Sequence, residues 1–151
     1  MPGTTFSEVY DNFMETVKDY RLDTLFTTSP TNFETYLSGF LIPSIEEFDI
    51  CDQSLAYSTA TFTETLSQRN ISILAKLMKK RWLEKEVADI KQINLGIFDK
   101  EYKRYAESNN MLAKQKMLIL EREEISQILV NYSLKNAVDW ASWYTGTFYT
   151  P

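Results

Sequence analysis

The sequence predicts an all-α fold, a single-domain bundle of about four to five helices, and three observations support this prediction. Apolar residues recur at the three- and four-residue spacing of amphipathic helices, in runs that start near Phe6, Phe33, Ile71 and Leu112. Two capping boxes mark helix starts early in the chain. A chain of 151 residues with 44% hydrophobic side chains can also bury a core without a disulfide or a metal.

The first helix is expected over residues 5–20. It opens on a capping box in which the Thr5 and Glu8 side chains would satisfy each other's backbone amides. Apolar residues then occupy one helix face and acidic residues the other. The Thr- and Ser-rich segment 23–30 is expected to break this helix.

A second capping box, formed by Thr31 and Glu34, is expected to open the next helix, which carries apolar residues to Phe48. Pro43 lies inside this pattern and has no amide proton to donate, so we expect a kink or a break into two short helices there. Residues 51–66 are rich in Ser, Thr and single apolar residues, which predicts a long extended loop or one short edge strand. Ordered connections of this length are uncommon unless they are functional or pack on a partner.

Two further helices complete the predicted bundle. Ser67 is expected to cap a helix whose apolar stripe continues to Gly96. Helical structure should restart soon afterwards and end before about Ala137. The predicted organisation is a helical domain over residues 1–136, followed by an extended aromatic arm over residues 137–151.

The predicted arm is a candidate partner-binding segment, because five of the last twelve residues are aromatic. Trp and Tyr anchor protein interfaces, whereas a terminal tail of this composition on a free monomer would promote aggregation. We therefore predict that the arm docks on another chain. The alternative is that it folds back and closes its own core. The predicted anchors are Trp140, Trp143, Tyr144, Phe148 and Tyr149.

Charge is divided unevenly along the chain, whose formal net charge is −5. Residues 1–66 hold two basic and eleven acidic side chains, a net −9, whereas residues 67–151 hold fourteen basic and ten acidic ones, a net +4. Such a dipolar subunit would meet a head-to-tail neighbour with complementary charge, unless the asymmetry is a matter of chance. The predicted basic contact between subunits consists of Lys76, Lys79, Lys80 and Arg81.

The composition argues against an enzyme. The chain has no histidine and a single cysteine, Cys51, so it lacks the commonest general base and metal ligand and cannot form an internal disulfide. The acidic clusters at residues 46–52 and 121–124 lack the ligand spacing and central glycine of a calcium loop, and we interpret them as solvated helix surface. We expect no catalytic residue, metal or cofactor, and a carboxylate-dependent hydrolase or nuclease is the least favoured alternative.

No signal peptide or membrane span is expected. The N-terminus lacks a basic stretch followed by an apolar run, and charges interrupt every apolar segment before about 18 residues. An acidic chain with a pI near 4.8 is also a poor general DNA binder. These features predict a soluble protein whose partners are other proteins.

Several segments, taken in order, resemble a known family. These are Cys-Asp-Gln-Ser-Leu at 51–55, a Thr-rich loop with Phe62 and Leu66, the run at 71–83, the run at 99–110, and Asn-Tyr-Ser at 131–133. Together they make residues 5–135 similar to the head-to-tail connectors, or adaptors, in the neck of tailed bacteriophages.

The resemblance implies a helical subunit that assembles as a ring, commonly twelvefold, beneath the portal protein of the capsid. Such a ring extends the DNA channel and offers a platform to the next neck or tail protein. It would lie in the virion neck after assembly in the host cytoplasm, and genomic DNA would pass through its lumen without specific binding. An acidic lumen suits that passage, because cationic walls would bind phosphates.

Two other roles remain open from the sequence. A stopper or tail-completion subunit lower in the neck would more often be built from β structure, and the single extended segment is too short for that. A small soluble helical regulator would instead bind one host protein through its aromatic tail. The mass of the assembled species distinguishes the regulator from a ring subunit.

Overall fold

The computed structural model describes residues 2–96 and 101–144 of the chain, with side chains for residues 2–89 and 109–135. Within these ranges the predicted all-α class is confirmed, because five helices account for most residues and the sheet is a single two-stranded hairpin. The elements in chain order are α1 Phe6–Thr16, α2 Tyr20–Thr28, α3 Pro30–Glu47, β1 Tyr57–Ser58, β2 Thr61–Phe62, α4 Gln68–Gly96 and α5 Glu101–Tyr144.

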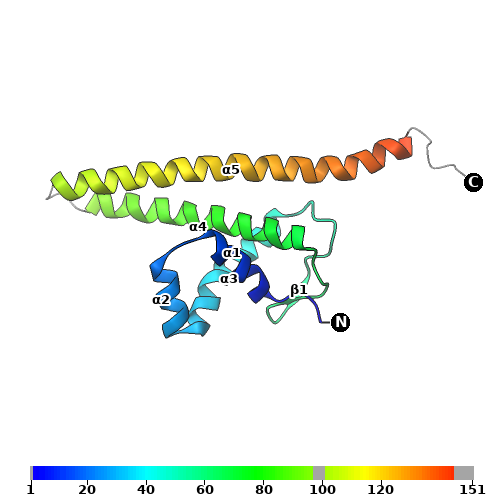
Figure 1. Ribbon diagram of the computed structural model, residues 1–151, viewed down its shortest axis with the longest axis horizontal. Helices are drawn as coiled ribbons and strands as arrows, with labels where there is room; N and C mark the ends of the chain where they lie inside the picture. The colour runs from blue at the N-terminus through cyan, green and yellow to red at the C-terminus, as the bar shows by residue number, and fades with distance from the viewer. Residues whose placement is uncertain (1, 97–100, 145–151) are drawn as a thin grey trace, which may run out of the picture.

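Helix α4 is the centre of the molecule. It runs antiparallel to α5, which covers one side, while α1 and α3 pack against it from the other side (Figure 1). At 1.5 Å per residue, α4 is about 44 Å long and α5 about 66 Å, so α5 extends beyond the start of α4 (Figure 1). A helix covered on two sides must be apolar around most of its circumference. The first half of α4 accordingly buries Ile71, Ile73, Leu74, Ala75, Leu77 and Met78.

The expected single helix over residues 5–20 is wrong beyond Thr16, where α1 ends. The segment 23–30, which was expected to break the helix, is also mostly helical, because α2 occupies it as far as Thr28. Asp19 caps α2, since its side chain accepts a hydrogen bond of 2.9 Å from the Arg21 backbone amide. The Thr hydroxyls that favoured a loop instead donate to the carbonyls one turn earlier, which satisfies them inside the helix. These residues are Thr24, Thr27 and Thr28.

The start of α1 is held by the hairpin rather than by a side-chain cap. The helix begins at Phe6, as the capping box predicts, but the Thr5 side chain makes no capping hydrogen bond. Instead Thr5 bridges Thr61, and the Phe6 amide donates to the Ala60 carbonyl at 2.9 Å. Backbone hydrogen bonds therefore pair the N-terminal segment with the hairpin as an additional extended stretch.

Helix α3 runs through Pro43 as one helix, so of the two expected outcomes, a kink or a break into two short helices, the break is wrong. A proline removes one hydrogen bond of the helical ladder, and buried neighbours on both sides hold the backbone in place. Phe40 and Leu41 lie in the core, and the buried Ser44 hydroxyl donates to the Phe40 carbonyl at 2.7 Å. The helix also starts at Pro30, before the expected capping box at Thr31.

Residues 48–67 contain no helix, and the β1–β2 hairpin lies within the segment expected to be extended. Thr59 and Ala60 at its turn have positive φ angles of 50° and 59°, as a tight two-residue hairpin turn requires. The expected cap of α4 is confirmed, because the Asn70 amide donates to the Ser67 hydroxyl at 3.3 Å.

The expected end of the last helix before Ala137 is wrong, because α5 continues to Tyr144. No glycine or proline occurs between Gly96 and Gly146, so no backbone signal ends the helix earlier. Residues 137–144 of the expected arm are thus helical. Residues 145–151, and every side chain of the arm, lie outside the described part of the chain.

Candidate interaction surface

The four cations predicted to contact a neighbouring subunit all form ion pairs inside the chain. Lys76 pairs with Glu124 and Lys79 with Glu121, so these two cations link α4 to α5. The remaining two, Lys80 and Arg81, both pair with Glu47 at the end of α3. The basic flank of α4 therefore joins the layers of one subunit, and a contact with a second subunit would have to compete with these pairs. Its role between subunits stays a prediction.

A second charged cluster joins three helices around Glu86 of α4. Glu86 is 5% exposed, and its carboxylate accepts from Arg21 of α2 at 2.6 Å and from Lys114 of α5 at 2.7 Å. The hydrogen bonds to Asp19 and then to Glu86 raise the pKa of Arg21 above its usual value. This cluster links α5 to α2 and α4.

A polar cluster at the start of α4 joins two of the segments quoted for the resemblance, 51–55 and 131–133, and we call it the Tyr132 network: Asp52, Gln53, Asn70 and Tyr132. The Asp52 amide donates to the Tyr132 hydroxyl at 2.8 Å, and that hydroxyl is hydrogen-bonded to the Asp52 carboxylate. Asn70 Nδ2 donates to Asp52 Oδ1 at 2.9 Å and to Gln53 Oε1 at 2.8 Å. The network ties the loop after α3 to both long helices.

The surroundings of Tyr132 make it a structural anchor. Its ring packs edge-on against Phe48 with 5.3 Å between centroids, and the Arg69 guanidinium lies 4.7 Å from the ring centroid. Burial, followed by the hydrogen bond to Asp52, raises the pKa of Tyr132 to about 12. Burial also raises the pKa of the adjacent Cys51 thiol, and a protonated thiol is a poor nucleophile.

Helix α5 carries large exposed apolar side chains outside its buried contact with α4, and we call this interrupted stripe the outer face. At 100° per residue, these positions lie roughly opposite the buried stripe of Leu118, Ile125 and Tyr132. Each member of the outer face is 49–64% exposed. The outer face consists of Leu112, Ile119, Leu120, Val130 and Leu134.

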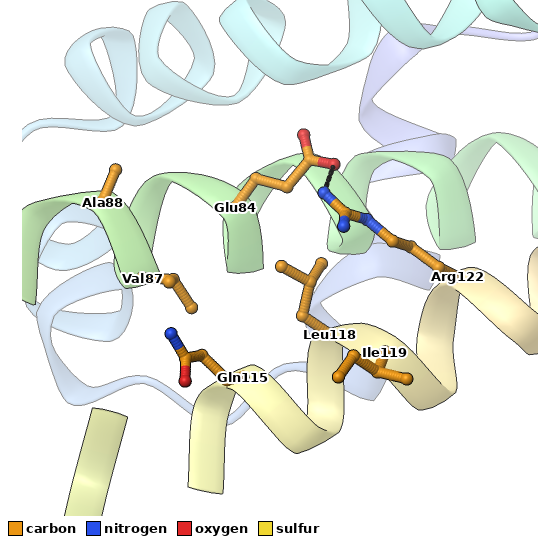
Figure 2. A pocket seen from close by; sticks show the side chains of 7 residues that line it. All are labelled: Glu84, Val87, Ala88, Gln115, Leu118, Ile119 and Arg122. Carbon is orange, nitrogen blue, oxygen red and sulfur yellow. Dashed lines mark hydrogen bonds and ion pairs between the residues drawn. The ribbon is translucent and has the colours of Figure 1, made fainter. Parts of the chain in front are cut away.

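A groove runs between the two long helices beside the outer face, with a cavity volume of about 550 Å³ (Figure 2). We call it the α4–α5 groove. Figure 2 shows the Glu84–Arg122 ion pair, at 2.8 Å, on one side and the Gln115 amide on the other, with apolar side chains between them. The lining residues are Glu84, Val87 and Ala88 from α4, and Gln115, Leu118, Ile119 and Arg122 from α5.

Sequence reasoning missed both features. The apolar residues of the last helix, including Leu112, Leu118 and Leu120, were counted as one helical pattern without separating the faces of the helix. A signal was present, since the apolar residues of α5 fall into two stripes instead of one. A helix that is apolar on two opposite faces needs a partner for each.

The predicted aromatic anchors cannot be placed on this surface. The side chains of Trp140, Trp143 and Tyr144, and the whole of Phe148 and Tyr149, lie outside the described residues, so their docking stays a prediction. Among the described residues there is no cluster of three or more acidic or cysteine side chains arranged to hold a metal ion. The same part of the chain contains no helix long and apolar enough to cross a membrane.

No protein-family model matches the chain, and comparisons with curated proteins and with solved structures gave no match either. The resemblance to phage connectors stays a prediction from the residues quoted for it.

Proposed function

We propose that this chain is a structural subunit of a phage neck, which assembles as a ring and joins the portal to the next neck or tail protein. In this role the ring, commonly twelvefold in the family it resembles, extends the DNA channel. It sits at the head-tail interface of the virion after assembly in the host cytoplasm. The role requires no catalysis, metal or cofactor.

The observation that carries the proposal is the outer face of α5. Large apolar side chains exposed along a helix are unfavourable in water unless a partner covers them, and groups of them mark interaction sites. Each member of this stripe is about half exposed or more, although the rest of α5 is well supplied with polar residues. A subunit that meets other chains along this helix explains the stripe.

The charge of the shorter helices agrees with a ring around DNA. Exposed carboxylates cover α1 to α3, including Glu8, Asp11, Glu15, Asp23 and Glu34. An acidic surface repels phosphates, so it would let DNA pass a lumen without adhering to it. The Tyr132 network adds support, because it joins the segments at 51–55 and 131–133 that carry the resemblance.

The mass of the full chain in solution tests this proposal, measured by light scattering alone and after mixing with portal rings. A ring subunit should form a closed species of many copies in at least one of these samples. A chain that stays monomeric in both, yet captures a single host protein, would overturn the ring and favour the helical regulator. Calorimetric titration with Mg²⁺ addresses the metal-dependent enzyme, and we expect no binding heat.

A further inference from the structure

The α4–α5 groove is shaped to receive a short aromatic segment. Its apolar floor is provided by Val87, Leu118 and the exposed Ile119, and polar groups stand at both sides. A volume of about 550 Å³ falls within the range of about 300–1,000 Å³ that is typical of ligand pockets. The groove therefore suits an occupant with large apolar side chains and a few hydrogen-bonding groups.

We propose that the occupant is the segment 145–151 of a neighbouring copy, with Phe148 and Tyr149 as its anchors. This inference rests on the proposed ring function and names the contact that links the subunits. The segment is Thr-Gly-Thr-Phe-Tyr-Thr-Pro, which combines two adjacent aromatic rings with hydroxyl groups. A Tyr side chain buries its ring and keeps a polar end that needs a partner, which the Gln115 amide and the Glu84 carboxylate can supply.

The reach of the chain excludes the subunit's own segment as the occupant. Arg122, the groove residue nearest to the end of α5, lies 22 residues before Tyr144, which corresponds to about 33 Å along the helix. Tyr149 follows Tyr144 by five residues, and five extended residues span at most about 18 Å. With α5 helical to Tyr144, the anchors can fill a groove only on another copy.

Such a contact is heterologous, because the C-terminal segment of one copy meets a different surface of the next. Heterologous contacts of this kind close into rings when the rotation between copies allows it. Each subunit then contributes one segment and one groove, and the contacts reinforce one another around the ring. The segment would cover part of the outer face, since Ile119 belongs to both surfaces.

Crosslinking of the full chain tests the contact. Cys51 is the only cysteine and is first replaced by Ser, which leaves two single-cysteine proteins to be made: Ala88→Cys in the groove and Thr147→Cys in the segment. Mixed under assembly conditions with a short thiol-specific crosslinker, they should give a covalent dimer of one copy of each. The matched control replaces Ala88→Cys by Thr35→Cys, an exposed position on α3, and should give no dimer.

Three outcomes would overturn the inference. Rings that form without the Ala88 to Thr147 crosslink would contradict the segment contact and leave the ring intact. Crosslinking of Thr147→Cys to the portal in place of the groove would assign the segment to a different partner. A chain that forms no assembly at all, alone or with the portal, would remove both the contact and the proposed function.

Discussion

The Tyr132 hydroxyl of α5 accepts a hydrogen bond of 2.8 Å from the backbone amide of Asp52 and is hydrogen-bonded to the carboxylate of the same residue, 80 positions earlier in the chain. This relationship fixes the long loop against α5 at one end of α4. The Glu86 cluster joins α2 and α5 to the second half of α4. Helix α5 is therefore held rigidly along α4 while its outer face stays open.

The first prediction concerns the Tyr132 hydroxyl. Replacing Tyr132→Phe keeps the ring against Phe48 but removes the partner of the Asp52 amide and carboxylate, so it should lower the free energy of unfolding by about 1–3 kcal/mol. Urea denaturation monitored by circular dichroism measures this loss. The control is Tyr20→Phe, because Tyr20 is 90% exposed and its replacement should have almost no effect. Equal stabilities of the two variants would contradict the anchoring role.

The second prediction is a pH dependence at the same residue. The pKa of Tyr132 is raised from an ordinary value of 10.0 to about 12, by burial first and then by the hydrogen bond to Asp52. A pKa raised in the folded state gives stability that is complete below the unfolded pKa and is lost as the pH rises through the folded pKa. The stability gap between the natural chain and Tyr132→Phe should therefore shrink between about pH 10 and 12.

The Tyr10 pKa is also raised to about 12, by burial and then by the charge of Glu34, but this residue is present in both proteins. Its contribution should cancel in the comparison. Denaturation series at several alkaline pH values provide the measurement. A gap that stays constant over that window would show that the Tyr132 hydroxyl does not titrate as described.

The third prediction compares two glycines. A Cβ atom on Gly3 would lie 1.7 Å from the Phe62 carbonyl oxygen, so Gly3→Ala must open the pairing between the N-terminal segment and the hairpin. Gly39 on α3 has nothing within 4 Å of the same atom, and Gly39→Ala should stabilise the helix by about 0.5–1 kcal/mol. Thermal denaturation should thus shift down for the first variant and up for the second. Shifts of the same sign would refute this packing.

The fourth prediction tests the Glu86 cluster. Glu86→Gln removes the charge that two cations share and should cost about 1–3 kcal/mol, because its polar atoms are buried. The surface pair of Lys85 and Asp89 provides the control, since both side chains are close to half exposed. Asp89→Asn should cost less than about 0.5 kcal/mol. A loss of stability for Glu86→Gln no larger than that of the control would show that the Glu86 cluster does not stabilise the fold.

The sequence predicts an element well where the signal is local. The start of α4 follows from the Ser67 cap, and the hairpin lies where Ser and Thr alternate with apolar residues. The division between α1 and α2 was missed, because Asp19 caps a helix made of residues that favour turns. The outer face was missed for a different reason. Whether Leu112 or Leu118 is buried depends on which side of α5 packs against α4, and this tertiary contact cannot be read from the local sequence.

The central claim is that copies of this chain assemble into a closed ring through contacts along α5. The most direct test is electron microscopy of the full chain mixed with portal rings, compared with the variant Val130→Lys and Leu134→Lys. Both replaced side chains are more than half exposed, so the variant should keep its circular dichroism spectrum. A control with the same added charge, Ala56→Lys and Ser58→Lys, places it on exposed positions of the hairpin region. We predict rings with an axial opening for the natural chain and the control, and none for the α5 variant, whereas rings from all three proteins, or from none, would contradict the account.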